Sequence, residues 1–341
     1  MKTNTLSAPT HTSSTQKSDP RGKQQDLGAL DWFRLAAAIL VIAIHTSPLS
    51  EINSTADLFL TGVAARVAVP FFFAVSGYFA DFSTASGLKK IVARTALNYL
   101  IATIVFLPVR AYYNFYFTEI LFEGVFYHFW YFPACIMGAL VVYMLKKLPM
   151  PAAFSIAGIL YIIGILGESY YGLVSDIEPF RTLYIFLYKI LPSTRDGFFI
   201  SPLFLLYGNT LSNSPRPTQR GYDILGLIVS IALLTAERFL LRDITVGPHD
   251  NLYFSLIPST IFLMRFLTSI KAEPRPFLRP FSMWIYILHP LIIHYLAKLE
   301  LGNSLLFAVI VVIVTLPSAL ICAAVMIKLK AVLRQYHTKT S

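Results

Sequence analysis

The chain is a succession of long apolar runs, and this succession constrains its fold more than any other feature. A run of about 20 apolar residues is long enough to cross the hydrocarbon core of a bilayer as a helix. Because 56% of the 341 residues are hydrophobic and only 13% are charged, a soluble domain is not expected. We predict an all-α polytopic membrane protein with about ten transmembrane helices packed as a bundle, at about 29–48, 58–82, 92–112, 127–145, 151–167, 197–212, 222–240, 252–270, 280–298 and 304–329.

A single membrane domain is expected to occupy most of the chain. Residues 1–28 are polar, rich in Ser and Thr, and contain no apolar segment typical of a signal peptide, which predicts a disordered cytoplasmic tail. The transmembrane domain is expected at 29–330, followed by a C-terminal cytoplasmic tail at 331–341. No internal repeat is evident, which argues against many secondary-transporter folds.

The distribution of basic residues predicts the orientation of the helices. Of the 28 lysines and arginines, 18 lie near the two termini and in the segments 89–94, 146–147, 216–220 and 271–279. Basic residues accumulate in cytoplasmic loops, so ten spans place both termini in the cytoplasm. This distribution also accounts for the net charge of +10 without a nucleic-acid partner.

Residues 167–196 form a long segment that this topology places on the outer face. Within it, residues 180–191 are aromatic and apolar but include Arg181 and Lys189 and precede Pro192. They are too few and too charged for a confident span, so we expect an interfacial or re-entrant helix. A loop this long is usually functional or disordered, and its aromatic content argues against disorder. Elsewhere the sequence offers no spacing of metal ligands, and no metal site is expected.

The first apolar run contains ionisable residues at both ends. Arg34 and His45 are eleven residues apart, which places them on one helix face about 16 Å apart along the axis. Histidine is the side chain most easily poised to move a proton near neutral pH, and intramembrane ionisable residues are usually functional. Two structural alternatives remain open: Arg34 pairs with Asp31 at the interface, or His45 is a buried neutral imidazole.

Three further runs contain unusual polar residues. The second run places Arg66 within the membrane, where it needs a partner or a water-filled cavity, and Pro70 predicts a kink. The fourth begins with an aromatic group typical of a membrane interface. A run near the C-terminus places three polar residues at i, i+4 and i+7, a stripe that must face protein or water: Ser282, Tyr286 and His289.

Taken together, these segments resemble the integral-membrane family usually called acyltransferase 3, which includes bacterial O-acetyltransferases of cell-surface sugars. The matching pieces keep their order over nearly the whole chain. They are Asp31-Trp32-Phe33-Arg34 with His45, Val69-Pro70-Phe71-Phe72-Phe73 running into Ser76-Gly77, the basic stretch from Lys89 to Arg94, His128-Phe129-Trp130-Tyr131-Phe132-Pro133, and Ser282-Met283-Trp284-Ile285-Tyr286-Ile287-Leu288-His289.

The resemblance implies a multi-pass enzyme of the bacterial plasma membrane with no bound cofactor. Its co-substrate would be cytoplasmic acyl-coenzyme A, commonly acetyl-coenzyme A, and its acceptor the hydroxyl of a carbohydrate or small molecule at the outer face. Besides these two substrates, membrane lipid would be its partner, and the oligomeric state stays open. His45 would be the catalytic residue. The residues on the acyl-coenzyme A or pore side would be Arg34, Arg66, Ser76, Lys90 and Arg94. Those on the acceptor side would be His128, Trp130, Tyr131, Glu168, Arg195, Tyr286 and His289.

Two features separate this chain from the common pattern. The basic motif usually reads Arg, two residues, Arg and then Pro, whereas here Lys89-Lys90-Ile91-Val92-Ala93-Arg94 is followed by Thr95. In addition, residues 167–173 and 194–204 are similar to the membrane half of the membrane-bound serine racemases of glycopeptide resistance. This similarity implies an alternative function, a transporter-like or amino-acid-handling module without acyl transfer. A third alternative is a scaffold that has lost its chemistry.

Overall fold

The computed structural model describes residues 27–110, 117–126, 128–195, 197–213, 219–244 and 251–340. Throughout these ranges the chain is built from helices. They contain no strand, and a single isolated bridge joins Leu27 to Ala272 beside the start of the first helix. The predicted all-α class is therefore confirmed for the described part of the chain.

Within the described ranges, five helical segments are long and apolar enough to cross a membrane. The first is α1 (Gly28–Thr46). The second, Ser54–Tyr78, combines α2 (Ser54–Phe59), the π-helical turn η2 (Leu60–Ala64), the 3-10 turn η3 (Ala65–Val67) and α3 (Ala68–Tyr78). The others belong to α4 (Ala85–Arg110), to α13 (Leu278–Leu296) continued by the 3-10 turn η4 (Ala297–Leu299), and to α14 (Ser304–Thr340).

The remaining helices are shorter or less apolar. Three short apolar helices are α6 (Tyr131–Leu145), α7 (Met150–Leu166) and α12 (Leu256–Ser269). The others are α5 (Phe117–Phe122), α8 (Tyr171–Val174), α9 (Glu178–Ile190), α10 (Ser201–Asn213) and α11 (Arg220–Leu240). Each of the ten apolar runs thus coincides with a helix, while ten membrane crossings remain a prediction.

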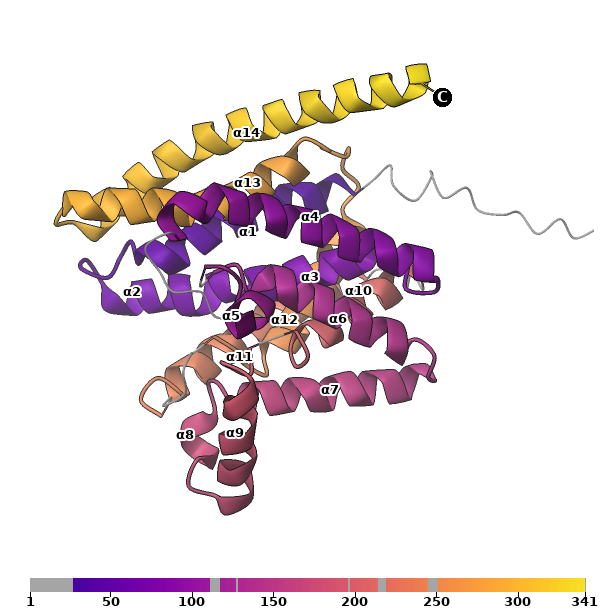
Figure 1. Ribbon diagram of the computed structural model, residues 1–341. Coiled ribbons are helices and arrows are strands. Elements are labelled where there is room, and N and C mark those ends of the chain that lie inside the picture. The colour runs from indigo at the N-terminus through magenta and orange to yellow at the C-terminus, as the bar shows by residue number, and fades with distance from the viewer. Residues whose placement is uncertain are drawn as a thin grey trace, which may run out of the picture.

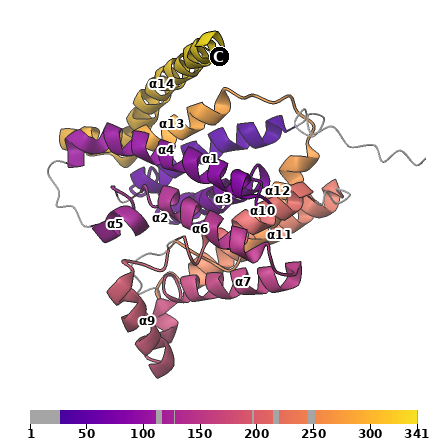
Figure 2. The same cartoon turned by 45° about the vertical axis from the view of Figure 1, so that its right-hand side comes forward.

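The long helices run roughly side by side, and successive ones alternate in direction (Figures 1 and 2). The start of α1 and the C-terminal end of α14 lie at the same end of the bundle (Figure 1). Helix α14 lies along one edge and α7 near the opposite edge, with α3 and α10 between them. The predicted N-terminal tail falls outside the described residues except for its last two, and α14 continues as helix through the predicted C-terminal tail to Thr340.

The second spanning segment is interrupted where the sequence predicts a kink. Pro70 has no backbone N–H, so it cannot bond to the carbonyl of Arg66 four residues earlier. The turns before it are a π turn and a 3-10 turn, and regular α-helix begins only at Ala68. Irregular turns of this kind are common next to functional sites in helices.

Helix α3 packs against α10 more closely than side chains would allow. A Cβ atom on Gly77 would lie 2.0 Å from the Leu205 carbonyl oxygen, and one on Gly208 would lie 1.8 Å from the Ala74 carbonyl oxygen. The two glycines therefore face each other's helix backbone and permit direct contact. The Asn209 amide adds a hydrogen bond of 2.8 Å to the Ala80 carbonyl just after α3.

The segment expected to be interfacial or re-entrant forms α9 (Glu178–Ile190), which runs across the direction of α7 (Figures 1 and 2). One face packs inward through Tyr184, whose hydroxyl donates to the Ile163 carbonyl at 2.7 Å. Next to it lies an exposed apolar stripe that includes Leu183 and Phe186, which is 59% exposed. This amphipathic surface and the crossing direction suit a helix lying in the plane of a membrane interface.

Candidate functional site

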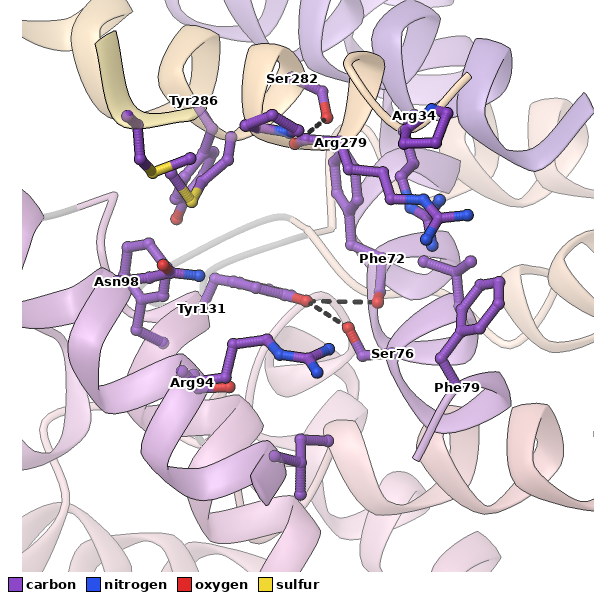
Figure 3. Close-up of a pocket in the computed structure, with 18 of the residues that line it drawn as sticks. Arg34, Phe72, Ser76, Phe79, Arg94, Asn98, Tyr131, Arg279, Ser282 and Tyr286 are labelled. Carbon is purple, nitrogen blue, oxygen red and sulfur yellow. Dashed lines mark hydrogen bonds between the residues drawn. The ribbon is translucent and has the colours of Figure 1, made fainter. Parts of the chain in front are cut away.

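A cavity of about 1110 Å³ opens among α1, α3, α4, α6, α13 and α14. Its size exceeds most pockets that hold drug-sized ligands. Basic side chains surround it on several sides (Figure 3). The charged and polar lining residues are Arg34, Ser76, Arg94, Thr95, Asn98, Tyr131, Arg279, Ser282, Tyr286 and Lys330.

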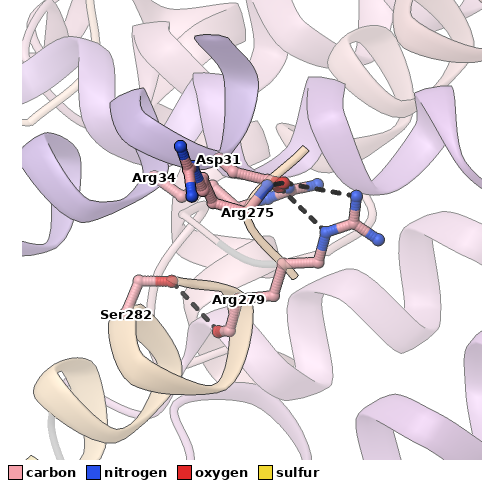
Figure 4. A network of polar contacts seen from close by, with 5 residues as sticks. All are labelled: Asp31, Arg34, Arg275, Arg279 and Ser282. Carbon is pink, nitrogen blue, oxygen red and sulfur yellow. Dashed lines mark hydrogen bonds and ion pairs between the residues drawn. The ribbon is translucent and has the colours of Figure 1, made fainter. Parts of the chain in front are cut away.

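A fully buried carboxylate holds two of these cations in place (Figure 4). Asp31 accepts hydrogen bonds from the Arg34 guanidinium, from Arg279 Nε at 2.9 Å and from the backbone N–H of Arg275 at 3.0 Å. The two guanidinium groups also lie over the Phe79 ring, at 5.2 Å for Arg34 and 5.3 Å for Arg279. One negative charge therefore positions two positive ones, and the mouth of the cavity keeps a net positive charge.

Deeper in the cavity, a tyrosine joins α6 to α3. Tyr131 lies 3.1 Å from the Ser76 hydroxyl and donates to the Phe72 carbonyl at 3.2 Å (Figure 3). The Arg94 side chain extends from α4 toward the same region (Figure 3). A phenol and a hydroxyl therefore lie in the same cavity as the guanidinium groups.

Tyr286 forms the inner wall of the cavity, and three histidines lie in contact with one another beyond it. The ring of Tyr286 is 5.9 Å from that of His128 and 6.1 Å from that of His289. His45 in turn lies 5.4 Å from His289 and 6.3 Å from His128, measured between ring centroids. No three or more His, Cys, Asp or Glu side chains of the described residues are placed to hold a metal ion.

A second polar group lies on the far side of the histidines. The Arg195 guanidinium stacks on the Trp130 ring at 4.8 Å from its centroid. Glu168 is completely buried and interacts electrostatically with Arg195. Arg66 donates a hydrogen bond to the Asn251 side chain, which supplies the partner that its position requires.

Comparison with known proteins assigns the family. A family model described as an acyltransferase domain matches residues 27–324, most of the chain. The chain belongs to this acyltransferase family.

Curated relatives that match this chain are named racemases. An amino-acid racemase of Enterococcus faecalis is 34% identical over 275 residues, which are 76% of this chain and 38% of the relative. A serine/alanine racemase of Enterococcus gallinarum is 33% identical over 315 residues, 84% of this chain and 44% of the relative. The chain thus spans less than half the length of these relatives, and the resemblance to serine racemases is confirmed. No solved structure matches the chain.

The structure divides the predicted donor-side residues into two sets. Arg34, Ser76 and Arg94 line one cavity. Arg66 and Lys90 do not: the first bonds to Asn251, and the second is exposed on α4 one turn before Arg94. Lys90 and Arg94 belong to one sequence motif, but only Arg94 lines the cavity.

The predicted acceptor-side residues are also divided. Tyr131 and Tyr286, which were predicted on the acceptor side, line the cavity together with Arg34. Each phenol is drawn to a backbone acceptor, the Phe72 carbonyl for Tyr131 and the His128 carbonyl for Tyr286. The other predicted acceptor-side residues do not line the cavity. His128 and His289 contact His45, and Trp130, Glu168 and Arg195 form the second polar group described above.

Sequence reasoning missed four polar residues of the cavity. Arg279 and Lys330 were counted only as cytoplasmic charges, and neither Thr95 nor Asn98 was assigned to a site. The spacing of Asn98 four residues after Arg94 would place both on one face of α4. Arg279 lies three residues before Ser282 on the polar stripe, so extending that stripe by one turn would have found it.

The buried carboxyl group of Glu168 gives a pH-dependent prediction. Burial raises the pKa of Glu168 from 4.5 to about 8, although the Arg195 guanidinium opposes this rise. The folded state therefore binds this proton more tightly than the unfolded state, so the stability that protonation contributes falls as pH rises from about 4.5 to about 8. Thermal unfolding at pH 5 and pH 8 should show Glu168→Gln gaining stability relative to wild type at the higher pH. Parallel pH profiles of the two proteins would contradict the assignment.

Proposed function

We propose that the protein transfers an acyl group, acetyl in the simplest case, from acyl-coenzyme A to a hydroxyl of a carbohydrate or related acceptor. The observation that supports this most strongly is the series of ring contacts that leads from a basic cavity, through Tyr286 and His289, to His45. Family membership supports the reaction class. The donor would enter from the end of the bundle that the charge distribution assigns to the cytoplasm.

The cavity suits the phosphates of coenzyme A. Arginine binds phosphate through a planar fork of charge-assisted hydrogen bonds. Arg94, Arg279 and Lys330 line the cavity from three different helices, so they can surround an anion rather than contact it from one side. Apolar side chains of α3 and α13 that line the deeper part suit the pantetheine arm and the acyl group.

In this proposal, His45 acts as a general base. One ring nitrogen takes the proton from the acceptor hydroxyl, whose oxygen attacks the thioester carbonyl carbon. The new C–O bond forms, the C–S bond breaks, and coenzyme A leaves as a thiolate that receives the proton. The acceptor would reach His45 from the side of Arg195 and Trp130, opposite to the donor.

The direct test is an acyl-transfer assay on the purified full chain. The protein would be incubated with radiolabelled acetyl-coenzyme A, and release of coenzyme A would be measured with and without candidate carbohydrate acceptors. Acceptor-dependent release supports the proposal. No release, and no transferred label under any condition, would contradict it.

A matched pair on α4 tests the donor side. Arg94→Gln should raise the KM for acetyl-coenzyme A about tenfold or more, because a hydrogen bond to a charged group contributes about 1.5–3 kcal/mol. Lys90 lies one turn before Arg94, but its side chain does not line the cavity. Lys90→Gln therefore removes the same charge from outside the cavity and should leave KM unchanged. Equal effects of the two substitutions would show that only the general positive charge matters.

A second function is favoured by the relatives and by the outer polar group. Proteins named amino-acid racemases match most of this chain, and Arg195 beside the Glu168 carboxyl group offers a cation for a carboxylate and a hydrogen-bond acceptor for an ammonium group. The alternative is a module that binds or passes a small amino acid without acyl transfer. Uptake of radiolabelled serine into proteoliposomes, without release of coenzyme A, would favour this alternative.

A further inference from the structure

We propose that His289 is a positioning residue that fixes the orientation and tautomer of His45 through its Nε2 atom. This inference deepens the proposed acyl transfer and depends on it.

The tautomer of His289 follows from its hydrogen bond. Its Nδ1 atom lies 3.0 Å from the carbonyl oxygen of Ile285, one turn earlier in α13. A carbonyl oxygen only accepts, so Nδ1 must carry the proton, and the Nε2 atom of the neutral ring then holds a lone pair. Pro290 follows directly and cannot donate to the carbonyl of Tyr286, which loosens this turn and leaves room for the ring.

The Nε2 lone pair is buried and needs a donor. His289 is fully buried, and its Nε2 has no hydrogen-bond partner among the described residues. Buried polar atoms in native proteins are usually paired. The His45 ring lies 5.4 Å away between centroids and is tilted by 34°, so rotation of the His45 side chain would suffice to bring one of its N–H groups to this atom.

This pairing would assign a different role to each nitrogen of His45. If one N–H of His45 donates to His289 Nε2, the other nitrogen keeps the lone pair and can take the proton of the acceptor hydroxyl. Holding the ring in one tautomer would keep the base in its active form throughout the cycle. His289 itself neither gains nor loses a proton in this step.

The other groups around His45 are less suited to this role. The His128 ring lies 5.5 Å from that of His289, about as near as the His45 ring, but it is inclined to His289 by 66° rather than 34° and lies 6.3 Å from His45. Its backbone carbonyl already accepts a hydrogen bond from Tyr286. Arg66 and Arg195 interact electrostatically with His45 but have no acceptor atom in their side chains.

Two isolated substitutions separate positioning from simple structural support. In His289→Asn, the amide nitrogen replaces Nδ1 and can still bond to the Ile285 carbonyl, but the acceptor at the Nε2 position is lost. In His289→Gln, the amide oxygen can replace the Nε2 acceptor. We expect His289→Asn to lower the kcat of acyl transfer from acetyl-coenzyme A at least tenfold with an unchanged KM, and His289→Gln to restore most of it. Retention by Asn and loss in Gln would overturn the proposal.

Nitrogen NMR of 15N-histidine-labelled protein gives a readout that does not depend on activity. Protonated and lone-pair ring nitrogens have well-separated shifts, and a His289→Asn spectrum identifies the signals of His289. We expect His289 protonated at Nδ1, with His45 in one tautomer that becomes a mixture in His289→Asn. Protonation of His289 at Nε2, or an unchanged His45 signal in His289→Asn, would overturn the proposal even if acyl transfer occurs. Absence of transfer in wild type would instead contradict the proposed function.

Discussion

His45→Ala is expected to reduce acyl transfer from acetyl-coenzyme A by about 10²–10⁴-fold, the usual loss when a general base is removed. The residue lies at the end of α1, in contact with His289 and near His128. Among the three contacting histidines, His45 is the one that α1 supplies. Because the donor cavity does not include His45, binding of acetyl-coenzyme A should persist.

A second histidine provides the matched control. His294 lies one turn beyond His289 on α13 and packs on Tyr295. His294→Ala removes an imidazole from the same part of the bundle and should leave the rate within a few-fold of wild type. Activity of His45→Ala near that of His294→Ala would exclude the assigned role. Retained binding of acetyl-coenzyme A by both variants, measured by calorimetry, would show that only chemistry was affected.

Substituting the glycines between α3 and α10 should have the largest effect on folding. In Gly77→Ala or Gly208→Ala, the added methyl group would meet a backbone carbonyl oxygen at 2.0 or 1.8 Å, a clash that only movement of a whole helix can relieve. Overpacking of this kind typically costs about 1–3 kcal/mol and more where backbone must move. We expect loss of monodisperse protein on size-exclusion chromatography and a lower unfolding temperature.

The control for this prediction is a glycine in an open position. A Cβ atom on Gly158, in the middle of α7, would have no neighbour within 4 Å. Gly158→Ala should therefore leave yield and unfolding temperature unchanged or slightly higher, because alanine favours the helix. If all three substitutions behaved alike, the close contact between α3 and α10 would not be limiting for the fold.

Much of the fold could be predicted because each apolar run determines its own helix. Hydropathy and length located a helix in each of the ten runs, although α4 begins earlier, at Ala85, and α14 ends later, at Thr340, and Pro70 located the irregular turns before α3. The same periodicity placed Arg34 and His45 on one face and gathered Ser282, Tyr286 and His289 into a stripe. These are local consequences of helix geometry, and they require no knowledge of which helices are neighbours.

The site could be predicted only in part, because its contacts join helices far apart in the sequence. Asp31 bonds to Arg279 and Arg275, almost 250 residues later, and no spacing rule links them. Tyr131 was assigned by its place at the end of a helix, whereas its phenol reaches across to Ser76. Side-chain length and the choice of neighbouring helix decided these outcomes.

The aromatic rings packed around Tyr286 have a consequence for the membrane potential of a cell. A polar path from the basic cavity to the outer arginine would, if continuous, let ions flow down the membrane potential. Tyr131, Phe132 and Tyr286 pack with ring centroids 5.6–6.0 Å apart across this path, between the cavity and the histidines. Packed rings at this position would restrict the passage of water and ions, so in the proposed function a two-carbon group would be transferred without opening an ion pathway. The protein would thereby exchange a chemical group between compartments and remain electrically insulating.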